Sequence, residues 1–65
     1  MDKLTQLTAV RSACGLFSVA YDGRILGDDR SYPTLEACKA EIDRRIAVDA
    51  RDAVRYDRPV MYTKA

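Results

Sequence analysis

The apolar residues at the start of the chain follow the spacing of a helix. They are separated by three, three and four positions: Leu4, Leu7, Val10 and Cys14. This spacing predicts a short amphipathic helix over residues 4–14, with Asp2 as its N-cap and Gly15 just beyond its end. Two threonines favour the alternative, a strand over residues 4–10, because β-branched side chains lose rotamer freedom in a helix.

The next segment has the pattern of a hairpin. Residues 16–21 favour β-structure, and Asp22-Gly23 and a short apolar pair at 25–26 follow them. An Asp-Gly pair suits a two-residue turn, because both central residues of that turn need a positive φ. The pattern therefore predicts an antiparallel β-hairpin whose first strand directs three side chains to the core: Phe17, Val19 and Tyr21. Residues 27–31 carry no apolar side chain and are predicted to form a loop.

The longest periodic segment predicts a helix. Thr34 is its N-cap, Glu36 adds a negative charge to the first turn, and the helix runs to about Tyr56. Residues 57–59, Asp-Arg-Pro, end the helix, because proline disfavours helical backbone in the residue before it. Residues 60–63 then favour a short terminal strand.

One face of this helix is apolar, with Cys38 and Ala50 on its flanks. At about 100° per residue it is formed by Leu35, Ile42, Ile46 and Ala53. The predicted fold class is α+β: a short N-terminal helix and an antiparallel hairpin, to which the C-terminal strand can add a third strand, packed against one long amphipathic helix. The 65 residues, 48% of them hydrophobic, are enough for a single domain spanning 1–65.

Overall charge gives little guidance to partners. Eleven basic and ten acidic residues leave a net charge of +1. No apolar run approaches the roughly 20 residues that span a bilayer, and the first residues lack the apolar core of a signal peptide. We therefore expect a soluble cytoplasmic protein that does not bind membranes.

The residue types present argue against catalysis. Histidine, the side chain best suited to proton transfer near neutral pH and the commonest metal ligand, is absent. Cys14 and Cys38 lie on the apolar faces of their predicted helices, so we expect both to be small buried hydrophobes, with a disulfide between them as the alternative. We expect no enzyme activity, no cofactor and no metal site.

Three arginines of the long helix lie within roughly 40° of one another, opposite its apolar face: Arg44, Arg51 and Arg55. Arg58 would join them if the helix continued. Guanidinium groups make forked contacts with phosphates and carboxylates, so this arginine line is a candidate binding surface. Flanking acidic residues, with Glu41 and Arg45 in the favourable order, support the alternative of a solvated face of mixed charge.

Two further groups are candidates for partner contact. Asp28 and Asp29 form an acidic loop near the predicted hairpin, where an ordinary polar loop is the alternative. Tyr32 and Tyr56 flank the long helix, and tyrosine is enriched at interfaces because its ring packs while its hydroxyl stays wet. The alternative for both tyrosines is a structural place at the edge of the core.

Part of the chain resembles a family of DNA-binding domains. Leu26-Gly27 and the run from Tyr32 to Asp43, Tyr-Pro-Thr-Leu-Glu-Ala-Cys-Lys-Ala-Glu-Ile-Asp, resemble the ethylene-response-factor type of domain and, more loosely, the arm-binding domain of phage integrases. The resemblance implies a small sheet followed by a packed helix, with DNA read by the sheet. The strands of those families carry Trp and several Arg, whereas residues 17–25 carry Arg24.

In size and style the chain is similar to a second class, the accessory proteins of phages and mobile elements, among them the anti-CRISPR proteins. This resemblance implies action by binding, without chemistry. Our leading hypothesis is a non-catalytic phage-type protein that inhibits a host nucleic-acid-handling complex, most specifically an anti-CRISPR protein bound to a CRISPR effector. The alternative is a small DNA-binding domain of a phage or mobile element, and homodimerisation stays open.

Overall fold

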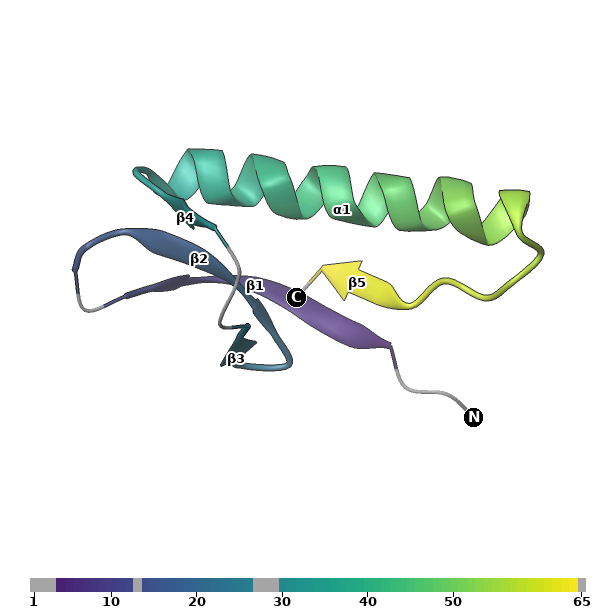
Figure 1. Cartoon of the computed structure of the whole chain (residues 1–65), viewed down its shortest axis with the longest axis horizontal. Helices are drawn as coiled ribbons and strands as arrows, with labels where there is room; N and C mark the ends of the chain where they lie inside the picture. The colour runs from purple at the N-terminus through teal and green to yellow at the C-terminus, as the bar shows by residue number, and fades with distance from the viewer. Residues whose placement is uncertain (1–3, 13, 27–29, 65) are drawn as a thin grey trace.

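The computed structural model describes residues 4–12, 14–26 and 30–64 and places a long helix along one face of a mixed β-sheet (Figure 1). In chain order the elements are β1 (Thr5–Arg11), β2 (Phe17–Tyr21), β3 (Arg24–Ile25), β4 (Ser31–Tyr32), α1 (Leu35–Arg55) and β5 (Tyr62–Lys64). The predicted α+β class is confirmed. The sheet differs from the prediction, because β5 pairs with β1 in parallel and the other pairings are antiparallel.

The predicted helix over residues 4–14 is wrong, and the strand alternative is confirmed in its place. β1 lies inside the sheet, antiparallel to β2 on one side and parallel to β5 on the other. Leu7 faces α1 and is 1% exposed, while Gln6 on the opposite face is exposed. The non-local pairing with β2 and β5 outweighs the local three- and four-residue spacing, which here reflects no shared face.

The Asp22-Gly23 turn lies where the sequence predicts it. Both residues have positive φ, 53° and 85°, and the turn joins β2 to the two-residue strand β3. Asp22 also anchors β1, because its N–H donates to the Gln6 carbonyl at 2.9 Å and its carboxylate accepts from the Gln6 N–H at 2.9 Å. The predicted hairpin, β2 with β3, is nevertheless short and adds only an edge to the sheet. The longer antiparallel pairing is that of β1 with β2.

The same edge of β2 also pairs with β4, a strand that the predicted loop over residues 27–31 does not foresee. β4 meets β2 at Phe17 and Ser18, and β3 meets it at Ala20 and Tyr21. β3 and β4 therefore share one edge of the sheet, and β5 lies on the opposite side of β1.

The long helix begins and ends as predicted. The Thr34 hydroxyl accepts a hydrogen bond from the Ala37 N–H at 3.1 Å, which satisfies one of the donors that a helix leaves unpaired at its start. Tyr56 is the C-cap, and Asp57 adopts a φ of 52° that turns the chain away from the helix axis. The predicted terminal strand is present as β5, which begins two residues later than expected.

The core lies between α1 and the two long strands. Its fully buried residues are Leu7, Val19, Cys38 and Ile42, and residues packed against them include Phe17, Tyr21, Ile46 and Tyr62. The predicted apolar face of the helix is correct for Ile42 and Ala53, but Leu35 is 37% exposed and Ala50 is exposed. Within the described residues, no helix combines the length and apolar character needed to cross a membrane.

Candidate functional site

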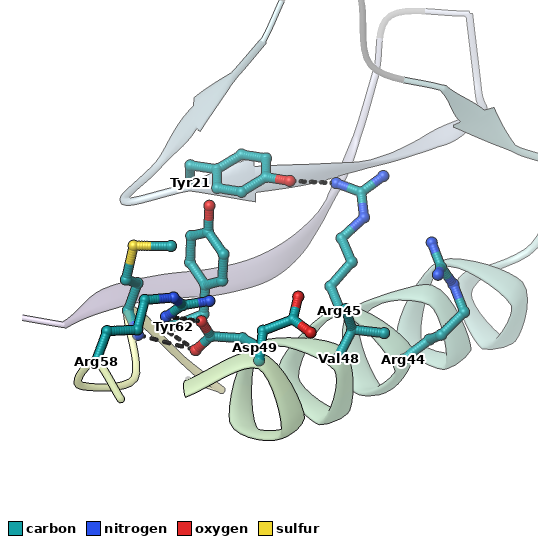
Figure 2. Close-up of a pocket in the computed structure, with 9 residues that line it drawn as sticks. Tyr21, Arg44, Arg45, Val48, Asp49, Arg58 and Tyr62 are labelled. Carbon is teal, nitrogen blue, oxygen red and sulfur yellow. Dashed lines mark hydrogen bonds and ion pairs between the residues drawn. The ribbon is translucent and has the colours of Figure 1, made fainter. Parts of the chain in front are cut away.

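A buried carboxylate joins the C-terminal half of α1 to the segment that enters β5. Asp49 is 4% exposed, and one of its oxygens accepts from Arg58 Nη1 at 2.9 Å (Figure 2). The other accepts from the backbone N–H groups of Met61 at 2.8 Å and Tyr62 at 3.1 Å. Asp49 therefore fixes the position of the chain just where it starts to run beside β1.

The charge of Asp49 is stabilised by these partners. Burial alone would raise the pKa of its carboxyl, but the Met61 N–H, the Arg58 guanidinium and the Tyr62 N–H all favour the ionised form, and the pKa lies below its ordinary value. A buried charge with these partners holds a structure together, and its oxygens are already occupied.

A second polar network lies one to two turns earlier on the same side of α1. Glu41 accepts from Arg44 at 2.7 and 2.6 Å in a bidentate pair and from Arg45 Nε at 2.7 Å. The hydrogen bond from Arg44, together with those from Arg45 and both positive charges, lowers the pKa of Glu41 from 4.5 to about 2. The predicted pairing of Glu41 with Arg45 is confirmed.

Arg45 carries this network across to the sheet. Its guanidinium donates to the Tyr21 hydroxyl on β2, lies 5.8 Å from the centre of the Tyr21 ring, and reaches the Tyr32 hydroxyl at 3.5 Å. The Tyr21 ring meets the Tyr62 ring edge to face, with centroids 5.8 Å apart. Figure 2 shows Tyr21 and Tyr62 from the sheet side facing Arg45 and Asp49 from the helix.

Between the two networks lies an open pocket of about 310 Å³, the polar pocket. Its lining includes Tyr21, Arg44, Arg45, Asp49, Arg58 and Tyr62. Arginine and carboxylate groups line it together, and the bonds described above occupy Arg45, Asp49 and Arg58. The pocket has room for one side chain of a partner, and its arginines and tyrosines are residue types that dominate protein interfaces.

The predicted arginine line faces solvent, but acidic residues pair with two of its members. Arg44 is 64% exposed and bonded to Glu41, and Arg51 is 69% exposed and 3.6 Å from Asp52. The Arg55 guanidinium lies 5.4 Å from the centre of the Tyr56 ring. Arg58 does not join this line, because it turns inward to Asp49.

The other predicted contact residues divide into three cases. Tyr56 is 62% exposed, as a partner contact requires. Tyr32 packs against the core and bonds Arg45, which matches the alternative of a structural role. Asp28 and Asp29 lie outside the described residues, so that part of the prediction is not tested.

Several exposed apolar side chains lie close together in the sequence, at the end of α1 and in the segment that follows it. Val54 is 86% exposed, Tyr56 62%, Val60 40% and Met61 46%. We call these residues, together with Arg51 and Arg55, the helix-end surface. They belong to the end of the molecule where α1 turns back toward β5 (Figure 1).

The cysteines do not share one environment. Cys38 is buried as predicted, but the prediction for Cys14 is wrong: with no helix there, its side chain is exposed, and no disulfide is found among the described residues. The Cys14 Sγ lies 3.0 Å from the Ser12 hydroxyl, and this hydrogen bond lowers the thiol pKa. The described residues contain no group of three or more side chains arranged to hold a metal ion.

Sequence reasoning missed the roles of Asp49 and Tyr21. From the sequence alone, Asp49 counts among the acidic residues that flank the arginine line, although its helical angle lies about 20° from that of Ile42. An acidic residue on the apolar face of a helix is a signal of a buried partner, but its partners are backbone groups that carry no sequence signature.

Comparison with known protein families, with curated proteins and with solved structures finds no match to this chain.

Proposed function

We propose that this chain is a non-catalytic interaction protein that binds another protein through its helix-end surface. The observation that carries the proposal is the clustering of Val54, Tyr56, Val60 and Met61, all 40% or more exposed, within eight residues. Aromatic residues, methionine and arginine are enriched in the centres of protein interfaces, where truncation of a few of them removes most of the binding energy.

The charges on the same side of the helix favour a protein over DNA as the partner. A DNA-binding face must offer cations that can replace the counterions of the phosphates. Arg44 is held by Glu41, and Asp52 lies beside Arg51, so much of the positive charge of the line is locally balanced. Mixed charges around an apolar centre suit the polar rim of a protein interface.

For the class of partner we propose a host nucleic-acid-handling complex, and most specifically a CRISPR effector that the chain inhibits. This step rests on the similarity in size and composition to phage accessory proteins of the anti-CRISPR type. A protein that inhibits by covering a surface of its target needs a stable contact surface and no catalytic groups. The helix-end surface supports action of this kind.

The direct test is a pull-down with the purified chain on CRISPR effector complexes, followed by an interference assay in cells that carry the same effector. We expect Arg51→Glu with Arg55→Glu, and separately Tyr56→Ala, to weaken capture at least about tenfold, the effect of losing a central interface residue. Asp28→Lys with Asp29→Lys tests the acidic loop in the same assay. Arg24→Glu, an exposed charge reversal on β3, is the matched control and should leave capture unchanged.

The outcome separates the hypotheses. Loss of capture in the helix-end variants, with folding intact by circular dichroism, supports the proposal. Submicromolar, salt-sensitive binding of duplex DNA that disappears with Arg51→Glu and Arg55→Glu would support the DNA-binding alternative instead. Capture that no variant weakens would refute the helix-end surface as the contact.

A further inference from the structure

In the part of the chain that the structure describes, one edge of β1 has no partner strand beyond Lys64, where β5 ends. β1 pairs with β5 only over Thr5–Leu7, although the strand continues to Arg11. The N–H groups of Gln6 and Ser12 point toward β2, where they meet Asp22 and Leu16. Because successive residues of a strand turn their backbone groups to opposite sides, those of Ala9 and Arg11 point to the β5 side. Among the described residues, none pairs with them there.

An apolar pocket of about 320 Å³ lies beside this open edge. It is lined by Leu7, Ala9, Leu35, Lys39, Ile42 and Lys64, from β1, α1 and β5. Leu35 belongs to the apolar face of the helix but is 37% exposed. The edge and the pocket together form what we call the open-edge groove, in which an unpaired strand and an apolar hollow lie side by side.

We propose that the open-edge groove binds an extended segment of another protein, which adds to the sheet as a strand continuing the line of β5. Strand addition satisfies the backbone groups of Ala9 and Arg11, and side chains on alternate positions of the added segment face the helix. The helix-facing residue beside Ala9 then enters the pocket between Leu35 and Ile42. A branched apolar side chain suits that position.

The charge at the groove selects an acidic partner segment. Lys64 Nζ forms an ion pair with Asp43 Oδ1 at 2.9 Å. Lys39, which lines the same pocket, forms no ion pair with the described residues. A carboxylate next to the apolar anchor would find Lys39 within the groove. A second copy of this chain fits less well, because a β1-to-β1 pairing is limited to Thr8–Arg11 and would bring the positive Arg11 and Lys39 of two copies together.

This site is separate from the helix-end surface, because Leu35 and Ile42 lie in the first half of α1, whereas the helix-end surface begins at Arg51. At about 1.5 Å per residue, Ile42 and Arg51 lie about 14 Å apart along the helix axis. The polar pocket lies on the other side of the buried face, because at about 100° per residue Lys39 falls on one side of Ile42 and Arg45 falls on the other. A partner can therefore hold one site while the other stays free, and a failure of either proposal leaves the other standing.

The test begins with a selection of short random peptides on the immobilised full chain, with counter-selection on Leu35→Glu. Selected peptides are then measured by fluorescence anisotropy against three variants. We expect the selected peptides to alternate apolar and acidic residues. Compared with wild type, the affinity for these peptides should be about tenfold weaker in Leu35→Glu and several-fold weaker in Lys39→Glu. Ala47→Glu is the control, because it places the same charge at an exposed helix position outside the groove, and it should change affinity less than about twofold.

Amide hydrogen exchange gives the second readout, because strand addition must protect the Arg11 N–H. We expect that N–H to exchange freely in the isolated chain and to slow at least about tenfold with bound peptide. Peptides that bind wild type and Leu35→Glu equally, or no enrichment over the counter-selection, would overturn the proposal. Concentration-dependent self-association that protects the Arg11 N–H without peptide would also overturn it, and would assign the groove to a second copy.

Discussion

The two sides of α1 carry pockets of nearly equal volume, about 310 and 320 Å³, which differ in the polar groups beside them and in how those groups are bonded. The polar pocket is surrounded by groups that bond one another, with Arg45 on Tyr21 and Arg58 on Asp49. The open-edge groove is lined by aliphatic side chains and an unpaired strand edge, with two lysines at its border.

The difference follows from what the chain places beside each half of the helix. After α1 the chain returns through Arg58 and Met61, whose groups complete the bonding of Asp49. β5 then ends at Lys64, level with Leu7, so the last part of β1 has no described strand beside it. A hollow whose polar groups bond one another stabilises the fold, and in this sense we call the side of α1 with Arg45 and Asp49 the closed side. The other side has a strand edge with unused backbone groups, which can bind something else, and we call it the open side.

The largest expected effect comes from the core residue between the two pockets. Ile42 is 2% exposed, and Ile42→Ala should lower the free energy of unfolding by about 3 kcal/mol, the usual loss for a buried branched side chain. Leu35→Ala is the control and should cost less than half as much, because Leu35 is 37% exposed whereas Ile42 is 2% exposed. Urea unfolding of both variants measures the difference, and equal losses would show that the groove is not open.

The next effect tests the closed side. Asp49→Asn keeps the shape of the side chain but removes the charge that holds Arg58 and two backbone N–H groups, so we expect a loss of about 2 kcal/mol. Asp52→Asn, one turn along the helix, should change stability by less than about 0.5 kcal/mol, because its contact with Arg51 is long and exposed. Similar losses in both variants would mean that Asp49 does not fix β5.

The smallest effect is a pH dependence on the closed side. The pKa of Glu41 is about 2 in the folded chain against an ordinary 4.5, so its ion pairs contribute stability above pH 4.5 that is lost as the pH falls toward 2. We expect about 1 kcal/mol at most, because Arg44 is largely exposed. The thermal unfolding temperature of wild type should fall more over this pH range than that of Glu41→Gln.

The control for this pH dependence is Ala47→Gln, a substitution at an exposed position of α1 that removes no titratable group. The unfolding temperature of this variant should change with pH in parallel with that of wild type. If Glu41→Gln also stays parallel to wild type, the network around Glu41 contributes nothing measurable to stability.

The long helix could be predicted from the sequence because its signals are local. Thr34, the aliphatic face and Asp57-Arg58-Pro59 each act through neighbouring residues, and the helix begins and ends where they predict. The N-terminal strand could not be predicted in this way, because strand formation there depends on pairing with residues up to about sixty positions away. The pairing of Thr5 with Tyr62 is one example.

The candidate sites divide in the same way. The exposure of Arg44, Arg51 and Tyr56 follows from their place on the helix, and the structure agrees. The role of Asp49 and the exposure of Leu35 depend on where β5 starts and stops, which no local pattern in the sequence records. Both pockets are therefore properties of the tertiary structure.

The most direct test of the contrast between the closed and the open side is amide hydrogen exchange of the isolated chain, read residue by residue. We predict slow exchange for the N–H groups of Met61 and Tyr62, which are bonded to Asp49, and for that of Val10, which points to β2. The Arg11 N–H should exchange faster than these by on the order of a hundredfold. An Arg11 N–H as protected as that of Val10 in a monomer at low concentration would contradict it.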